Sequence, residues 1–118
     1  MRILDFSEMW PKLQEPEFTT FRFPRKDKDW YVGEVVQLVF KPRSEEREVL
    51  GTAEIVRIGG RWIFTAIDNR CLHLSEKEAI ADGFPSKDEM RRWLRHAYGI
   101  TRLIYEPMNK LTLRKGGE

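Results

Sequence analysis

The segment from Leu74 to Gly99 constrains the fold more than any other part of the chain, because it encodes two helices together with their ends. Ser75 stands three residues before Glu78, and Ser86 stands three residues before Glu89. This is the spacing of a capping box, in which the serine side chain and the acid satisfy free backbone N–H groups of the first helical turn. The spacing therefore predicts two helix starts only eleven residues apart.

The two helices are predicted over residues 76–82 and 87–98, because a glycine follows each and can adopt the left-handed conformation that ends a helix. In the second helix the apolar residues share one face, and basic residues occupy the other. The apolar set is Met90, Trp93, Leu94, Ala97 and Tyr98. We expect this helical unit to lie across a small sheet, with Trp93 in the core beneath it.

Most of the remaining chain has the alternating, β-branched and aromatic composition of short strands. Six strands are predicted, over residues 18–23, 35–40, 49–58, 61–67, 101–106 and 110–114. Gly59-Gly60 has the composition of a two-residue hairpin turn. The first fourteen residues are predicted to form one or two helical turns, with an edge strand at residues 2–4 as the alternative.

These elements predict an α+β fold in a single domain over residues 1–118. Six short strands would leave exposed edges in an open sheet, and closure removes those edges. We therefore expect a small β-barrel of mostly antiparallel strands, with the helical pair inserted before the last hairpin.

Composition excludes several classes of protein. The single cysteine, Cys71, rules out an internal disulfide and a multi-cysteine zinc site, and neither His73 nor His96 has a second ligand at metal spacing. We expect no metal and no cofactor. There is no signal peptide or membrane-spanning apolar run, so we expect a cytoplasmic protein without membrane contact. The few Asn, Gln and Cys residues favour a heat-adapted source.

A net charge of +2 does not by itself indicate a nucleic-acid partner. Basic residues nevertheless gather at the end of the first predicted strand and in the loop after it, interrupted by two aspartates. The cluster consists of Arg22, Arg25, Lys26 and Lys28. Such a surface can contact phosphate or can simply be a solvated face. Both interpretations remain open from composition.

Several motifs occur in one order along residues 18–114. They are Thr20-Phe21-Arg22, the set Trp30, Gly33 and Glu34 before a hydrophobic strand, the set Gly51, Glu54 and Ile55, the segment LSEKEAIADGF at residues 74–84, and a helix ending in Tyr98-Gly99. In this order the motifs resemble the ASCH domains, a branch of the PUA-like barrels. The resemblance implies a PUA-like barrel whose cleft, between barrel and helices, binds RNA or a nucleotide.

The resemblance also implies site residues. Thr20, Arg22 and Asp82 would face the cleft. The partner we expect is single-stranded RNA or a nucleotide, with phosphates contacted by Arg22 and by the loop residues Arg25, Lys26 and Lys28, and with a base stacked on Trp30. The alternatives are that Trp30 is a core residue at the barrel mouth and that Arg22 pairs with Asp82 to hold barrel to helix.

Some proteins that resemble this family are amidohydrolases that deacylate acetylcytidine with a Lys-x-x-Thr-x-Arg strand and an acidic residue. Carried over to this chain, the threonine is Thr20, the acid is Asp82, and the lysine position is occupied by Glu17. A glutamate there could act as a base, which gives Thr20, Asp82 and Glu17 as candidate catalytic residues. Other members are ribonucleases. A third possibility is a protein-interaction module that uses the basic helix face at Arg91, Arg92 and Arg95.

Overall fold

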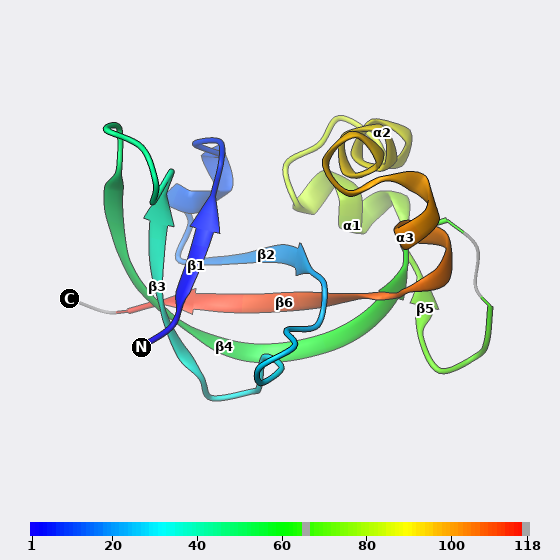
Figure 1. The fold of residues 1–118 in the computed structure, drawn as a ribbon, viewed down its shortest axis with the longest axis horizontal. Coiled ribbons are helices and arrows are strands. Elements are labelled where there is room, and N and C mark those ends of the chain that lie inside the picture. The colour runs from blue at the N-terminus through cyan, green and yellow to red at the C-terminus, as the bar shows by residue number, and fades with distance from the viewer. Residues whose placement is uncertain (65–66, 117–118) are drawn as a thin grey trace.

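The computed structural model describes residues 1–64 and 67–116 and has a mixed α+β architecture (Figure 1). A curled sheet forms the body of the molecule, and the helices gather over one end of it. In chain order the elements are β1 (Ile3–Phe6), a 3-10 helix (Pro11–Gln14), β2 (Glu17–Arg22), β3 (Val35–Phe40), β4 (Glu48–Trp62), β5 (Leu72–His73), α1 (Glu76–Ala81), α2 (Lys87–Tyr98), α3 (Ile100–Tyr105) and β6 (Met108–Lys115).

The sheet has the strand order β1-β3-β4-β6-β2, and the short β5 pairs with the end of β4. β1 runs parallel to β3, and the pairs β3–β4, β4–β6 and β6–β2 are antiparallel. Register shifts in the β3–β4 and β4–β6 ladders mark irregularities of the kind that bend a sheet. The result is a half-barrel rather than the expected closed barrel. Across the opening, Arg22 Nη2 of β2 donates to the Asp5 carbonyl of β1 (2.7 Å).

The prediction of a hairpin turn at Gly59-Gly60 is wrong. Both glycines lie inside the 15-residue strand β4, where Gly59 pairs with Lys110 and Gly60 pairs with Asn109. A Cβ atom on Gly60 would lie 2.3 Å from Cys71 Sγ, so the glycine permits a close approach of the segment that leads into β5. The sequence pattern of two glycines between apolar runs fits either role. Of the strand expected over residues 61–67, Arg61 and Trp62 belong to β4, and residues 65–66 lie outside the described residues.

The prediction of a strand over residues 101–106 is also wrong, because the helix α3 occupies this part of the chain. The helical pair is therefore a group of three helices, and no hairpin joins residues 101–106 to the last strand within the described chain. The apolar side chains Ile100, Leu103 and Ile104 fit a helical face as well as they fit a strand, and Leu103 is fully buried in the core beneath the helices. A six-residue segment is too short for its apolar periodicity to distinguish a helix from a strand.

Most of the other local predictions agree with the structure. β2 and β3 match the first two predicted strands, and β6 includes the last one. Ser75 and Glu78 form the full capping box of α1. At the start of α2 the Ser86 hydroxyl accepts from the Glu89 N–H (3.1 Å), but the Glu89 carboxylate accepts from Arg92 Nη1 (2.7 Å), so the second predicted capping box is only half formed. At the N-terminus, β1 corresponds to the edge-strand alternative, and the helical turn is the 3-10 helix.

Two hydrophobic clusters fill the half-barrel. One lies between β1, β3, β4, β6 and the start of β2, and the other lies between the helices and the opposite end of the sheet. Trp10 packs against both clusters, so the residues just before the 3-10 helix connect the two halves of the core. Among the described residues, no helix is long and apolar enough to cross a membrane.

Glu78 attaches α1 to the sheet in addition to capping it. Its Oε2 accepts from Arg61 Nε of β4 (2.8 Å) and from Lys110 Nζ of β6 (2.7 Å). Partial burial raises the pKa of Glu78, but the hydrogen bonds from Lys110, the Ser75 N–H and Arg61 outweigh burial and lower the pKa to about 2. The carboxylate is thus charged at neutral pH, and the end of α1, where Asp82 stands, is held over the sheet.

Candidate functional site

A cavity of about 160 Å³ lies between the curled sheet and α2. Its walls come from the end of β1, the segment before β2, β2 itself, the α1–α2 connection and α2. An apolar cavity of about 150 Å³ can hold one benzene-sized ring, whereas drug-sized ligands need about 300 Å³ or more. The cavity therefore has room for a single ring and not for a whole nucleotide.

Lys12 and Asp82 form a buried ion pair in the cavity wall. Lys12 Nζ lies 3.0 Å from Asp82 Oδ1 and also donates to the Thr19 carbonyl (2.8 Å). Thr19 Oγ1 donates to the same Asp82 Oδ1 (3.2 Å). Both hydrogen bonds that this carboxylate accepts from described side chains end on Oδ1, so Oδ2 can accept a hydrogen bond from a ligand.

Burial shifts the pKa values of both partners toward their neutral forms. Desolvation lowers the pKa of Lys12 and raises the pKa of Asp82, and the attraction between the two charges opposes both shifts. A buried ion pair of this kind is poor evidence for stability, since apolar residues of similar volume commonly stabilise as well or better. Its presence beside a cavity points to a role in binding or chemistry.

Arg22 lies on the cavity wall but is engaged by its neighbours. Its Nε donates to Thr20 Oγ1 (3.3 Å), and its other nitrogens contact Asp5 Oδ1 (3.3 Å) and the Asp5 carbonyl. The guanidinium also lies over the Phe6 ring, 4.9 Å from the centroid. Arg22 therefore pairs with Asp5, and Asp82 pairs with Lys12. The alternative prediction, an ion pair between Arg22 and Asp82, is wrong.

Three aromatic side chains, which we call the aromatic trio, form the wall opposite β2. They are Trp10, Phe84 and Trp93. Ring centroids in the trio are 5.1 Å apart for Trp10–Phe84, 5.8 Å for Trp10–Trp93 and 5.9 Å for Phe84–Trp93, with tilted or edge-to-face geometry. The expected core position of Trp93 is only partly correct, because its side chain is half-buried and lines the cavity.

The structure brings together some of the expected site residues and separates others. Thr20, Arg22 and Asp82 line the cavity, and Thr20 and Asp82 are each 5% exposed. Glu17 does not line the cavity; it lies at the other end of β2, where it faces Arg114 at 3.7 Å. The expected catalytic group of Thr20, Asp82 and Glu17 is therefore not assembled.

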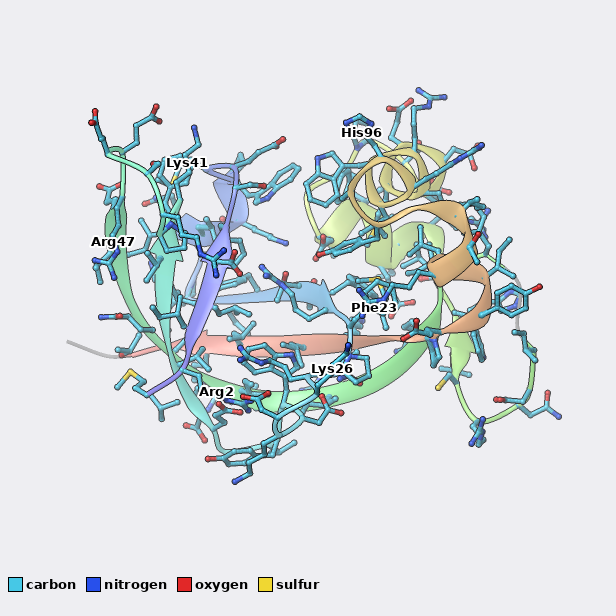
Figure 2. All side chains as sticks on the ribbon, in the orientation of Figure 1. Arg2, Phe23, Lys26, Lys41, Arg47 and His96 are labelled. Atoms are coloured by element: carbon cyan, nitrogen blue, oxygen red, sulfur yellow. The ribbon has the colours of Figure 1, made fainter. Side chains whose placement is uncertain are left out.

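The expected phosphate loop does not line the cavity either. Lys26 lies on the far side of the sheet from the helices (Figure 2). Arg25 pairs with Asp27 (3.1 Å), and Lys28 Nζ lies 4.6 Å from the centroid of the Tyr31 ring. Trp30 is 8% exposed in the sheet core, with Arg2 stacked over it at 4.6 Å, so it offers little surface for base stacking.

Sequence reasoning missed the lysine that does reach the cavity. Lys12 lies on the 3-10 helix, outside every motif, and its Nζ crosses to Asp82, seventy positions away. The only feature of the sequence that marks Lys12 is its position between apolar residues in a short helical turn after Pro11. This position does not indicate which acidic residue Lys12 would contact. The apolar periodicity of this turn predicts that Trp10 packs on the core, but it does not predict that Trp10 lines a cavity.

In residues 1–64 and 67–116, no three His, Cys, Asp or Glu side chains are grouped as metal ligands would be. Comparison of the chain with protein-family models, with curated proteins and with solved structures gives no match.

Proposed function

We propose that this chain is an ASCH-type domain of the PUA-like class that binds the base of an RNA or nucleotide in the cavity. The observation that carries the proposal is the buried Lys12–Asp82 pair beside a ring-sized cavity with aromatic walls. Further support comes from the motif residues Thr20, Arg22 and Asp82, on which the resemblance to ASCH domains rests, because all three line this cavity.

The chemistry of the walls suits a nucleobase. A base presents hydrogen-bond donors and acceptors along one edge and a flat apolar face on each side. Lys12 Nζ can donate to a carbonyl or ring nitrogen, Asp82 Oδ2 can accept from an exocyclic amine, and the Thr20 hydroxyl can do either. The aromatic trio supplies faces and edges against which a ring can pack. Arg22, paired with Asp5, completes the polar part of the wall.

Binding is expected to be visible at two of the four tryptophans. When ribonucleoside monophosphates are added, the indole N–H resonances of Trp10 and Trp93 should shift in NMR spectra, whereas those of Trp30 and Trp62 should not, because both of the latter are buried away from the cavity. Replacing Trp93 with leucine should weaken binding about tenfold, in line with about 1–3 kcal/mol per stacked base.

Tyr105→Ala is the matched control, since Tyr105 is an exposed aromatic residue on α3 that does not line the cavity. It should leave the affinity unchanged. Uniform shifts at all four indoles, or an equal loss of affinity in both variants, would show that the nucleotide does not enter the cavity.

A second candidate function is hydrolysis of an acylated nucleoside, and the position of Lys12 favours it. The resemblance requires an amine beside Thr20, which residue 17 does not supply, and Lys12 brings one into the same cavity from the 3-10 helix. Burial lowers the pKa of Lys12 and so favours its neutral amine. In that form the amine could take the proton of the Thr20 hydroxyl as the oxygen bonds to the acyl carbon; the C–N bond would then break, the proton would pass to the leaving amine, and water would hydrolyse the acyl-threonine to acetate.

This candidate function predicts that the protein releases acetate from N4-acetylcytidine. Thr20→Ala and Lys12→Met should each lower the rate at least about a hundredfold, because general-base and nucleophile losses are typically that large. Glu17→Gln should leave the rate unchanged, because Glu17 lies away from the cavity. If acetate is released no faster than in buffer alone, hydrolysis is excluded as the function, and the proposal of base binding is unaffected.

A further inference from the structure

A hollow of about 260 Å³ lies beside α2 and has no lining residue in common with the cavity of the proposed function. Its wall combines three guanidinium groups with one carboxylate and one aromatic ring. All three arginines that the sequence places on a basic helix face line it. We call it the arginine hollow, and its lining residues are Phe64, Asp88, Arg91, Arg92 and Arg95. The arginine hollow is therefore a separate surface of basic character.

Arg91 is fixed in the wall of the arginine hollow by the residues that follow β4. Its Nε donates to the Ile63 carbonyl (2.7 Å), and its guanidinium lies over the Phe64 ring, 5.4 Å from the centroid. A guanidinium has five N–H donors, so those on both Nη atoms remain for a ligand. A side chain that is already ordered loses less entropy when it binds an anion. Arg91 is thus a preorganised donor.

The positive charge of the arginine hollow is poorly balanced. Among the described residues, Arg91, Arg95 and Asp88 form no ion pair, and the pair of Arg92 with Glu89 (2.7 Å) is solvent-exposed. Arg91 and Arg95 are four positions apart on α2, where like charges repel each other. The helix dipole favours a cation in the last turn, which accounts for Arg95 but not for Arg91 in the middle of the helix. An anion between the two guanidiniums would relieve their repulsion.

We infer that the arginine hollow docks an acidic segment of a partner protein, with one carboxylate held between Arg91 and Arg95. A guanidinium can present two parallel N–H donors to a carboxylate. Arginine and aromatic residues are also enriched at protein–protein interfaces and among the residues that contribute most to binding. A hollow of about 260 Å³ is smaller than the pocket of a drug-sized ligand and accepts one or two side chains.

The carboxylate of Asp88 favours a protein segment over nucleic acid as the occupant. Successive backbone phosphates carry only negative charge, so Asp88 and the adjacent Glu89 would repel them. A peptide offers donors as well as carboxylates, because each residue except proline has a backbone N–H that Asp88 can accept. An apolar side chain of the same segment can pack on the half-buried Phe64. The lining therefore matches an acidic segment that also carries apolar side chains.

The probe is a fluorescein-labelled peptide in which glutamate and leucine alternate, and its binding is followed by anisotropy at low salt. A peptide with glutamine in place of glutamate should bind at least about tenfold more weakly, and so should the acidic peptide with Arg91→Gln/Arg95→Gln. Asp88→Asn should strengthen binding of the acidic peptide about twofold to threefold, because it removes a repelling charge and keeps a hydrogen-bond acceptor. Raising the salt concentration should weaken binding through screening.

Arg43→Gln/Arg47→Gln is the matched control, because it also removes two exposed arginines four positions apart. Both belong to the β3–β4 connection, and Figure 2 shows Arg47 on the opposite side of the molecule from the helices. The control should change peptide affinity less than about twofold. Arg95→Glu leaves the contacts of Arg91 in place and should weaken binding at least as much as the double variant in the hollow, so a loss there does not come from the packing of Arg91.

No binding of the acidic peptide by the wild-type protein at low salt would overturn the inference, as would equal losses in the control and in the variants of the arginine hollow. A single-stranded RNA of equal charge that binds more tightly than the peptide and loses affinity in Arg95→Glu would also overturn it, since nucleic acid would then be the occupant. Base binding in the cavity is tested separately. The shifts of Trp10 and Trp93 with ribonucleoside monophosphates should persist in Arg91→Gln/Arg95→Gln, because neither arginine lines the cavity.

Discussion

Replacing Asp82 with alanine is expected to lower the free energy of unfolding by about 3–5 kcal/mol. The substitution leaves Lys12 buried without its partner, and an uncompensated buried charge is among the most costly single changes. Lys12 is 8% exposed and its Nζ lies 3.0 Å from Asp82 Oδ1, and no other carboxylate among the described contacts replaces the missing charge. Urea unfolding at neutral pH measures the loss.

The stability deficit of Asp82→Ala should decrease as pH rises. Burial already lowers the pKa of Lys12 in the folded protein, and removal of Asp82 lowers it further, whereas the unfolded chain keeps a pKa near 10.5. Between these two pKa values the unfolded state binds the extra proton, so folding becomes more favourable with increasing pH. Unfolding curves of wild type and variant between pH 7 and about 10 should therefore converge.

The double variant Lys12→Met/Asp82→Leu separates stability from function. It removes both charges at once, so its loss of stability should be smaller than the sum of the single losses, with a coupling energy of about 0.5–3 kcal/mol. Nucleotide binding should nevertheless remain impaired, because the donor and the acceptor in the cavity are both gone. Strictly additive losses would mean that the two side chains do not interact in solution.

Gly60→Ala is expected to destabilise the protein by about 2–3 kcal/mol, the upper part of the usual range for overpacking. The new Cβ would lie 2.3 Å from Cys71 Sγ and 3.2 Å from Cys71 Cβ, so β4 and the segment before β5 must move apart. Adding Cys71→Ala removes the sulfur and should restore most of the stability. Thermal or urea unfolding of the single and double variants tests both expectations.

Gly59→Ala provides the matched control. Its new Cβ meets only the Arg61 guanidinium, with Nη1 at 2.9 Å. That side chain can shift, at the cost of loosening its ion pair with Glu78 (2.8 Å), so the loss should be smaller than for Gly60→Ala. Neither Gly59 nor Gly60 has a positive φ, whereas both would need one in a two-residue type I′ hairpin turn. A large loss in both alanine variants would therefore contradict a continuous β4 and favour a turn.

Local chemistry determined the parts of the fold that could be predicted from sequence. The two helix starts at Ser75 and Ser86 agree with the structure because capping is a contact between residues three positions apart. Strands β2 and β3 agree because their apolar and β-branched residues are continuous in the sequence. The same local reasoning failed at residues 101–106 and at Gly59-Gly60, where short patterns fit two structures and packing against distant segments decides between them.

For the candidate site, the motif residues Thr20, Arg22 and Asp82 were identified from sequence and do line one cavity, but their partners were not. The partner of Asp82 is Lys12 rather than Arg22, and the partner of Arg22 is Asp5. Seventy positions separate Lys12 from Asp82. No periodicity or spacing rule connects residues that far apart, so only the packing of the 3-10 helix against the end of α1 makes them neighbours.

The sequence by itself determined where the helices α1 and α2 begin and end, and which segments form β2, β3 and the body of β6, because these features depend on neighbouring residues. It also determined that no disulfide links the elements, because the chain has one cysteine. The tertiary structure decided that the sheet remains a half-barrel, that the charged loop after β2 lies away from the cavity, and that a lysine outside every motif enters it. These outcomes depend on long-range packing and on the cost of burying charge, which act between residues remote in sequence.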